Sequence, residues 1–267
     1  MGNILDKIIA DKIVEVDGRI VETPLDSLKE RIADMGKCRN FYQAVTKKNL
    51  RGVNVIAEVK KASPSAGLIR ADFDPIEIAQ TYEKCGADAI SVLTDEKYFQ
   101  GKLEYVTQVK QAVGLPVLRK DFLIDEYQVY ESRAAGADAI LLIAEALKPA
   151  KLMDMLILAS KLTLTAIIEV HSADSLLALR SLVGFPVKHY SVIGINNRDL
   201  ATMTVDINTT GRLAELVEDT SELIAESGIK TRADVEKVIA IGAGAILIGE
   251  TLCRSKSIEQ KFKELFG

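Results

Sequence analysis

The stretch GADAI at residues 86–90 decides the fold, because the same five letters recur at residues 136–140. A looser copy, GAGAI, occupies residues 242–246. In each copy a glycine follows a helix-like segment and precedes a short apolar run. Glycine stops a helix readily because it adopts the left-handed conformation without Cβ strain. The recurrence therefore predicts a chain built from repeated strand–helix units.

Eight short apolar runs, rich in Val and Ile, continue this pattern along the chain. They are near-continuous hydrophobic segments, which is typical of strands buried on both faces in a parallel sheet. Successive runs start roughly 30 residues apart, which is enough for a strand, a helix and two loops. The eight runs are residues 53–59, 89–93, 116–118, 139–143, 165–168, 192–195, 223–225 and 245–248.

Eight strand–helix units predict an α/β fold, a single (βα)8 TIM barrel domain spanning residues 1–267. Residues 1–48 precede the first run and contain helix-like segments at 4–14 and 25–35, so we expect an N-terminal helical extension packed on the barrel. An open doubly wound sheet is the alternative. That fold usually shows fewer repeats and a glycine-rich first turn, and no GxGxxG follows the first run here.

Composition and charge exclude several classes of protein. The chain has 34 basic and 38 acidic residues, no Trp and no run of five Lys or Arg, which argues against nucleic-acid binding. Its three cysteines and two histidines are widely separated, so we expect no metal site and reduced thiols. No apolar run approaches the roughly 20 residues that span a membrane. We therefore expect a cytoplasmic protein that acts on small molecules.

Polar side chains recur at the C-terminal ends of the apolar runs. In a barrel these ends converge on one face, where active sites form. Glu58 and Lys60 are two residues apart on one strand and so share a face. Lys120 and Glu169 come from different sectors, an arrangement that can place a proton donor and an acceptor on opposite sides of a substrate. Further polar residues of this kind are Asn196, Glu226 and Glu250.

Two loops after the runs suggest binding functions. Ser227, Gly228 and Gly249 follow the seventh and eighth runs, where this fold often binds phosphate through backbone N–H groups. Glu250 belongs to the same segment, although its carboxylate has to turn away from a phosphate. Plain tight turns are the alternative. A loop containing Ser63 and Ser65 follows the first run and predicts either a lid or a surface turn. Phe99 and its neighbour Tyr98 either stack on an aromatic substrate or pack against the extension.

Five longer motifs together resemble the indole-3-glycerol-phosphate synthase family. They occur in family order and cover the chain from about residue 53 to its end. The motifs are VIAEVKKASPS at 55–65, LRKDF at 118–122, IEVH at 168–171, INNRDL at 195–200 and ESGI at 226–229. Ala66 and Lys102 depart from the commonest pattern, in which many relatives carry Lys and Ser.

The resemblance implies a reaction on 1-(2-carboxyphenylamino)-1-deoxyribulose 5-phosphate. Its ring closes by attack on the carbonyl, and CO2 and water are then lost to give an indole, with no cofactor and no metal. By resemblance, Lys120 is the general acid, Glu169 its partner in dehydration, and Glu58 supports proton transfer. The substrate-binding residues implied are Lys60, Ser63, Ser65, Phe99, Phe122, Asn196, Arg198 and Glu226, and the phosphate-binding residues are Ser227, Gly228, Gly249 and Glu250. Lys60 would lower the pKa of Lys120, whereas Glu58 opposes that shift.

Two other functions remain open from the sequence. A sugar-phosphate isomerase such as phosphoribosylanthranilate isomerase is the alternative enzyme, but it is expected to place a catalytic Cys where this chain has Glu58-Val59-Lys60. A non-catalytic phosphate-binding protein is the third reading. It has no need of a donor and an acceptor placed as Lys120 and Glu169 are.

Overall fold

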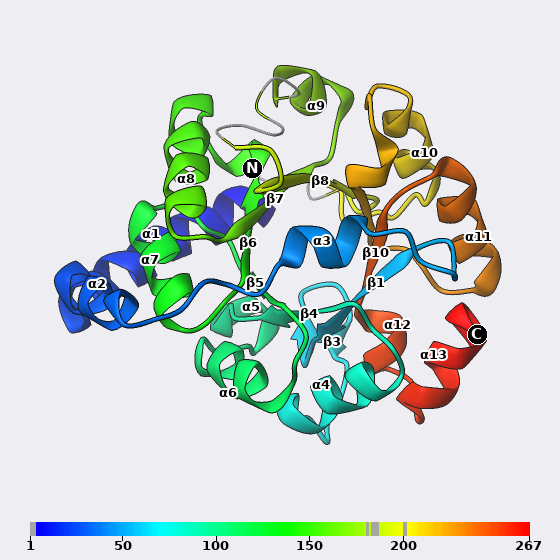
Figure 1. The fold of residues 1–267 in the computed structure, drawn as a ribbon, viewed down its shortest axis with the longest axis horizontal. Coiled ribbons are helices and arrows are strands. Elements are labelled where there is room, and N and C mark those ends of the chain that lie inside the picture. Colours follow the sequence, from blue (N-terminus) through cyan, green and yellow to red (C-terminus); the bar gives the residue numbers. More distant parts are fainter. Residues whose placement is uncertain (1–3, 180–181, 183–186, 200–201) are drawn as a thin grey trace.

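The computed structural model describes residues 4–179, 182, 187–199 and 202–267. Eight parallel strands close into a barrel (Figure 1), and each predicted apolar run overlaps one of them. The first and last strands pair with each other, with Asn54 opposite Ala245, so the open-sheet alternative is wrong. In chain order the barrel strands are β1 (Asn54–Val59), β4 (Ala89–Leu93), β5 (Val117–Lys120), β6 (Ala139–Ile143), β7 (Thr165–Val170), β8 (Ser191–Asn196), β9 (Leu223–Glu226) and β10 (Ala245–Ile248).

Side chains alternate between the inside of the barrel and the layer beneath the helices. Ile56 and Leu118 belong to the inner cluster of buried apolar residues, whereas Val55 and Val117 belong to the larger cluster outside it. This alternation is the ordinary pleat of a strand. It sends neighbouring residues of β5 to opposite sides, which matters for the charged residues at its C-terminal end.

Helices follow the strands, and side chains cap several of them. The side chain of Asp74 accepts hydrogen bonds from the first turn of the helix that starts at Pro75, and Asp125 caps the helix that starts at Glu126 in the same way. The helices that cover the barrel are α4 (Pro75–Lys84), α6 (Glu104–Ala112), α7 (Glu126–Ala134), α8 (Pro149–Lys161), α9 (Ala173–Leu179), α10 (Asn208–Ala214), α11 (Arg232–Ile241) and α13 (Ile258–Phe266). Shorter elements are α5 (Glu96–Phe99), η1 (Ala144–Ala146), η3 (Thr220–Glu222), α12 (Glu250–Cys253) and the hairpin of β2 (Ala62–Ser63) and β3 (Gly67–Leu68).

Three helices precede the first strand: α1 (Ile4–Glu22), α2 (Leu25–Ala33) and α3 (Phe41–Thr46). α1 is longer than the predicted segment 4–14, because Val16 is buried and Arg19 pairs with Glu131 of α7. α3 crosses the N-terminal end of the barrel (Figure 1), where Phe41 packs against the inner apolar cluster. Residues 1–3 of the predicted extension lie outside the described residues.

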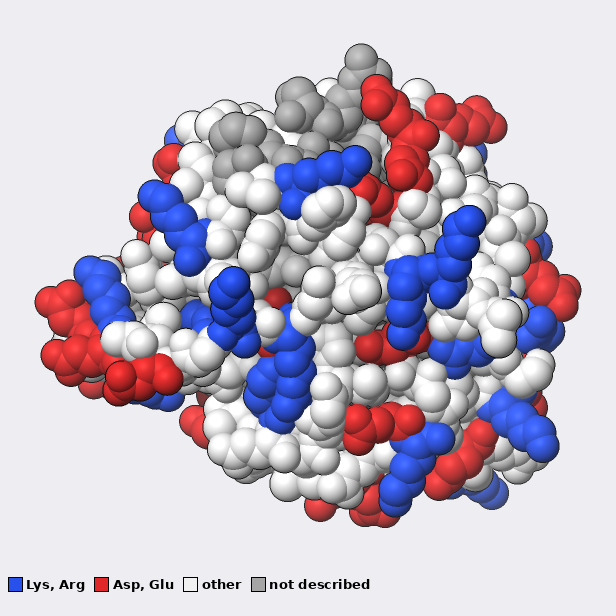
Figure 2. All heavy atoms as spheres, viewed as in Figure 1, with Lys and Arg blue, Asp and Glu red and all other residues white. Residues whose placement is uncertain are grey.

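The charge on the face that carries α3 is mixed. Figure 2 shows Lys and Arg interspersed with Asp and Glu over this face. Within the described part of the chain, no helix combines the length and the apolar character needed to cross a membrane.

Candidate active site

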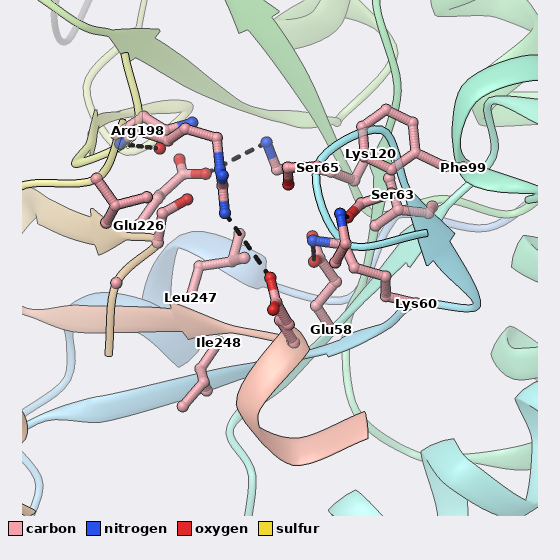
Figure 3. A pocket seen from close by; sticks show the side chains of 18 of the residues that line it. Glu58, Lys60, Ser63, Ser65, Phe99, Lys120, Arg198, Glu226, Leu247 and Ile248 are labelled. Carbon is pink, nitrogen blue, oxygen red and sulfur yellow. Dashed lines mark hydrogen bonds and ion pairs between the residues drawn. The ribbon is translucent and has the colours of Figure 1, made fainter. Parts of the chain in front are cut away.

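A cavity of about 730 Å³ opens at the C-terminal end of the barrel strands. The structure brings together there all the polar strand-end residues singled out from the sequence, and Figure 3 shows Glu58 and Lys60 across the cavity from Arg198 and Glu226. For several strands, the apolar run predicted from the sequence ends before the polar residue that follows it. In the structure Lys120, Asn196 and Glu226 are the last residues of β5, β8 and β9, so a strand backbone positions each of them.

The ammonium group of Lys120 lies between two buried carboxylates. Its Nζ donates to Glu169 Oε2 at 2.7 Å and lies 3.2 Å from Glu226 Oε2. Burial alone lowers the pKa of Lys120, but attraction by Glu169, Glu226 and Glu58 outweighs burial and holds the pKa above its ordinary value. The sequence left the net shift open between Lys60 and Glu58; in the structure Lys60 Nζ pairs with Glu58 Oε1 at 2.5 Å, and the carboxylates dominate around Lys120.

The two carboxyl groups beside Lys120 differ in protonation. Burial raises the pKa of Glu169, but Lys120 and His171 more than offset this and hold it well below its ordinary value. Burial raises the pKa of Glu226 to about 8, Lys120 opposes this, and the neighbouring negative charge of Glu169 adds to it. Oε1 of Glu226 is buried and has no hydrogen-bond partner among the described residues. Lys120 is therefore flanked by one ionised carboxylate, Glu169, and by one carboxyl group, Glu226, that is largely neutral at pH 7.

Two glycines make room for these carboxyl groups. A Cβ at Gly249 would lie 2.4 Å from Glu58 Oε1, and a Cβ at Gly194 would lie 2.3 Å from Glu226 Oε1. A side chain larger than hydrogen at either position therefore requires the neighbouring carboxyl group to move. Gly249 was singled out from the sequence only for phosphate binding, and its contact with Glu58 is a further role. Gly194 was missed, because nothing in the sequence shows that Glu226 lies against it.

The predicted phosphate segment lines one side of the cavity. Ser227 and Gly228 adopt left-handed φ angles of 66° and 83° in the turn after β9. Glu250 accepts a hydrogen bond from Arg254 at 3.0 Å, and its other oxygen lies 3.7 Å from Arg198. The carboxylate of Glu250 thus has two arginines as partners. Position 200, the last of the INNRDL motif, lies outside the described residues.

The opposite side of the cavity is more apolar. The rings of Phe99 and Phe122 are 6.2 Å apart, and Lys60 Nζ lies 5.9 Å from the centre of the Phe99 ring. Ser63 and Ser65, in the β2–β3 hairpin and its turn, also line the cavity. Of the two aromatic residues left undecided by the sequence, Phe99 faces the cavity, whereas the hydroxyl of Tyr98 donates to Asp11 of α1.

The extension contributes to this wall as well. Ile4, Leu5 and Ile8 of α1 line the cavity, and sequence reasoning did not identify them. Their helical spacing is a signal of a buried face, but it does not say which surface the face covers. Among the residues that the structure describes, no group of three or more His, Cys, Asp or Glu is arranged to hold a metal ion.

Comparison with known proteins gives sequence matches over nearly the whole chain. The family model described as indole-3-glycerol phosphate synthase matches residues 5–265. A protein of that name from Geobacillus thermodenitrificans is 45% identical over 264 residues, which cover 99% of this chain and 97% of the relative. Another from Dehalococcoides mccartyi is 43% identical over 266 residues, covering 98% and 99%.

Solved structures show the same architecture at much lower identity. A 3-hexulose-6-phosphate synthase superposes with a TM-score of 0.62 at 16% identity, covering 80% of this chain and 98% of its own. Phosphoribosylanthranilate isomerase from Thermotoga maritima gives a TM-score of 0.56 at 12% identity, covering 80% and 96%. These likenesses concern the fold alone.

Proposed function

This chain belongs to the indole-3-glycerol phosphate synthase family, and we propose that the polar residues of its barrel mouth divide the family's reaction among them as follows. The enzyme converts 1-(2-carboxyphenylamino)-1-deoxyribulose 5-phosphate to indole-3-glycerol phosphate in tryptophan biosynthesis. The observation that carries our assignment is the ammonium group of Lys120, held between Glu169 and Glu226 at the floor of the cavity.

Lys120 is the general acid of ring closure. The aromatic carbon that bears the carboxylate attacks the ribulose carbonyl, and negative charge develops on the carbonyl oxygen. Because its carboxylate neighbours keep Lys120 charged, it has a proton to give to that oxygen, which becomes a hydroxyl group. Breaking the bond to the carboxylate then releases CO2 and restores the aromatic ring. A cavity that removes the carboxylate from water favours this step.

Glu169 and Glu58 serve proton transfer around Lys120. The new hydroxyl group leaves as water, and the ring must lose a proton to become an indole. Glu169 is ionised and lies 2.7 Å from Lys120, so this pair can exchange the protons that dehydration requires. Glu58 keeps Lys60 in place beside the cavity. The unpartnered Oε1 of Glu226 and the amide of Asn196 are suited to the substrate's hydroxyl groups.

The ends of the substrate differ in polarity, as do the two sides of the cavity. We assign the aromatic ring to the apolar side with Phe99 and Phe122. The phosphate goes to Ser227, Gly228 and Gly249, with Arg198 and Arg254 nearby. Without substrate, both arginines pair with the carboxylate of Glu250. The phosphate of the bound substrate takes the place of this carboxylate as their anionic partner.

The extension and the barrel form one folding unit in this proposal. Support comes from Lys12 of α1, whose Nζ lies within 3.0 Å of Asp95 and Asp121 in the barrel. We also propose that the enzyme acts in the cytoplasm and without nucleic acid. The free thiols of Cys38, Cys85 and Cys253 are consistent with a reducing compartment.

Incubation with the carboxyphenylamino substrate tests the proposal. Indole fluorescence should appear with the wild-type enzyme and be lost in Lys120→Met and Glu169→Gln variants that remain folded by circular dichroism. Turnover of phosphoribosylanthranilate in place of this substrate would support the isomerase alternative. Binding of the substrate without any product would support the non-catalytic one.

A further inference from the structure

His171 lies between two carboxylates, one of which belongs to the site. It follows β7 directly and is two residues beyond Glu169, so the two side chains lie on the same side of the chain. His171 Nε2 lies 3.2 Å from Glu169 Oε1, and Nδ1 lies 3.0 Å from Glu145 Oε2. The imidazole thus links the barrel interior to η1, the element that follows the neighbouring strand.

Glu145 fixes this histidine in place. Its Oε1 also accepts a hydrogen bond from the backbone N–H of His171 at 2.9 Å, so one carboxylate holds both the backbone and the ring. The side chain of His171 is only 10% exposed. A neutral imidazole carries one N–H, whereas both nitrogens here lie within 3.2 Å of a carboxylate oxygen: Nδ1 is hydrogen-bonded to Glu145, and Nε2 is in ion-pair contact with Glu169 without a hydrogen bond. The arrangement is therefore suited to the doubly protonated, cationic ring.

The surrounding charges agree with the cationic form. The groups that face the ring are Glu169 on β7 and Glu145 on η1, with Lys120 beyond Glu169. Ser175 of α9 and Asn196 of β8 are neutral contacts of the two carboxylates. Burial alone lowers the pKa of His171, but Glu145 and Glu169 outweigh it and raise the pKa to about 10.

We propose that His171 is a positioning residue for Glu169. Its ring cation attracts Glu169 Oε1, which also accepts a hydrogen bond from Asn196, and this leaves Oε2 directed at Lys120. The cation also keeps the carboxylate ionised and ready to accept a proton. The inference rests on the proposed role of Glu169. His171 is not among the described residues that line the cavity, so it acts through Glu169 and not on the substrate.

The first test is the pH dependence of kcat in His171→Gln. Loss of the cation should raise the pKa of Glu169, so the acid limb of kcat should move up by about one pH unit or more, with KM within twofold. Glu145→Gln should move it in the same direction by less. Ser172→Ala, which removes the hydroxyl that accepts from Ser175 N in the same segment, is the matched control and should keep the wild-type profile. Overlapping profiles for His171→Gln and wild type would overturn the inference.

The second test uses nuclear magnetic resonance and does not depend on catalysis. The chain has two histidines, so a His189→Gln variant leaves only the imidazole signals of His171. These should remain those of the imidazolium form up to about pH 9, and the titration should move to lower pH when Glu169→Gln is added. A neutral His171 ring at pH 7 would overturn the inference.

The two failures are distinguishable. If Glu169→Gln retains wild-type kcat, the proposed role of Glu169 is wrong, whatever His171 does. If Glu169→Gln loses activity while His171→Gln leaves the pH profile unchanged, only the inference about His171 is wrong.

Discussion

Two clusters of buried charge meet on one strand and differ in how completely their members are paired. Lys120 of β5 points into the barrel and forms the inner cluster with Glu169 and Glu226. Its chain neighbours Arg119 and Asp121 belong instead to an outer cluster, which joins β5 to α7 and to α1 of the extension. The outer cluster consists of Arg119, Asp121, Glu131, Lys12 and Asp95.

The outer cluster pairs every charge that it buries. Lys12 is 1% exposed and contacts Asp95 at 2.9 Å and Asp121 at 3.0 Å, while Arg119 contacts Asp121 at 3.1 Å and Glu131 at 2.8 Å. Burial raises the pKa of Asp121, but Lys12 and Arg119 more than offset this and lower it. The inner cluster instead leaves one carboxyl oxygen without a partner and opens to the cavity. Removing one member of a fully paired buried cluster leaves a charge without compensation, whereas incomplete pairing leaves groups free to react with a substrate.

The largest expected effect is in the inner cluster. Lys120→Met keeps the apolar stem of the side chain and removes the proton donor, so kcat should fall by about 10²–10⁴-fold with a modest change in Tm. Steady-state kinetics and thermal unfolding measure the two quantities. A folded variant with kcat within tenfold of wild type would contradict the general-acid assignment.

Glu169→Gln sharpens that test within the same cluster. It should impair dehydration more than ring closure and decarboxylation, so CO2 should appear before indole in a single turnover. If instead Lys120 and Glu169 form only a structural ion pair, both variants would unfold more easily and keep their activity when folded.

The next effect belongs to the outer cluster and should appear in stability. Lys12→Met removes the cation that pairs with buried Asp95 and leaves Asp121 with Arg119 alone, which should lower the free energy of unfolding by about 3–5 kcal/mol. The kcat of the folded enzyme should change by less than about threefold, because Lys12 does not line the main cavity. Urea unfolding measures the change.

The control for this variant is Lys29→Met, which removes an exposed ion pair with Asp26 and should cost less than about 1 kcal/mol. Equal losses in the two variants would show that burial of the outer cluster contributes nothing.

The clusters should also respond differently to pH. The folded-state pKa of Glu226 is raised to about 8, so the native state binds more protons than the unfolded chain between the ordinary carboxyl pKa and that value. The free energy of unfolding should therefore fall as pH rises from about 5 to 8, and Glu226→Gln should reduce this slope. The share that remains, above about pH 6.5, comes from the raised pKa of His171.

The pKa of Asp121 is shifted in the opposite direction from that of Glu226. Its folded-state pKa is lowered, so its contribution is complete above the ordinary carboxyl pKa and is lost only as pH falls through the lowered value. Asp121→Asn should accordingly reduce stability across pH 5–8 without changing the slope. An unchanged slope in Glu226→Gln would place the raised pKa on another residue.

The smallest effect is expected at the cavity wall, outside both clusters. Ser227 has a left-handed φ of 66°, which Asp and Asn tolerate better than most residues. Ser227→Asp adds a negative charge beside the proposed phosphate site and should raise KM about tenfold, equivalent to about 1.4 kcal/mol. Ser227→Asn, with the same shape and no charge, should raise it far less. Equal KM values in the two variants would show that the phosphate binds elsewhere.

The sequence predicted a feature correctly where the residues that reveal it lie on a single strand. The apolar runs and the glycines before them predict all eight strands, and Glu58, Lys120 and Glu169 stand out because charge at a buried strand end is costly unless it is used. Gly228 could also be identified from the sequence, because it follows the seventh apolar run, where a turn is expected. Its φ of 83° shows that a Gly228→Asp variant would be strained as well as charged, which is why Ser227 is the better site for the test.

What the sequence could not predict depends on distant contacts. Lys12 and Asp121 are far apart in the chain, and neither lies in a pattern that points to the other. Glu226, whose Oε2 lies 3.2 Å from Lys120 Nζ, reaches it from the far side of the barrel. His171 belongs to a quoted motif, yet its role depends on Glu145, which the sequence places on a different connecting segment.

Because Gly249 lies against Glu58, the residue that fits at one of these positions depends on the residue at the other. A Cβ at position 249 would lie 2.4 Å from Glu58 Oε1 and 2.9 Å from Glu58 Cβ, so any larger residue there forces Glu58 to move. A shorter side chain at position 58 reduces this restriction, so positions 58 and 249 have to be redesigned together. Gly194 and Glu226 form a second such pair. Redirecting this barrel to another substrate therefore requires exchanging glycine and carboxylate together.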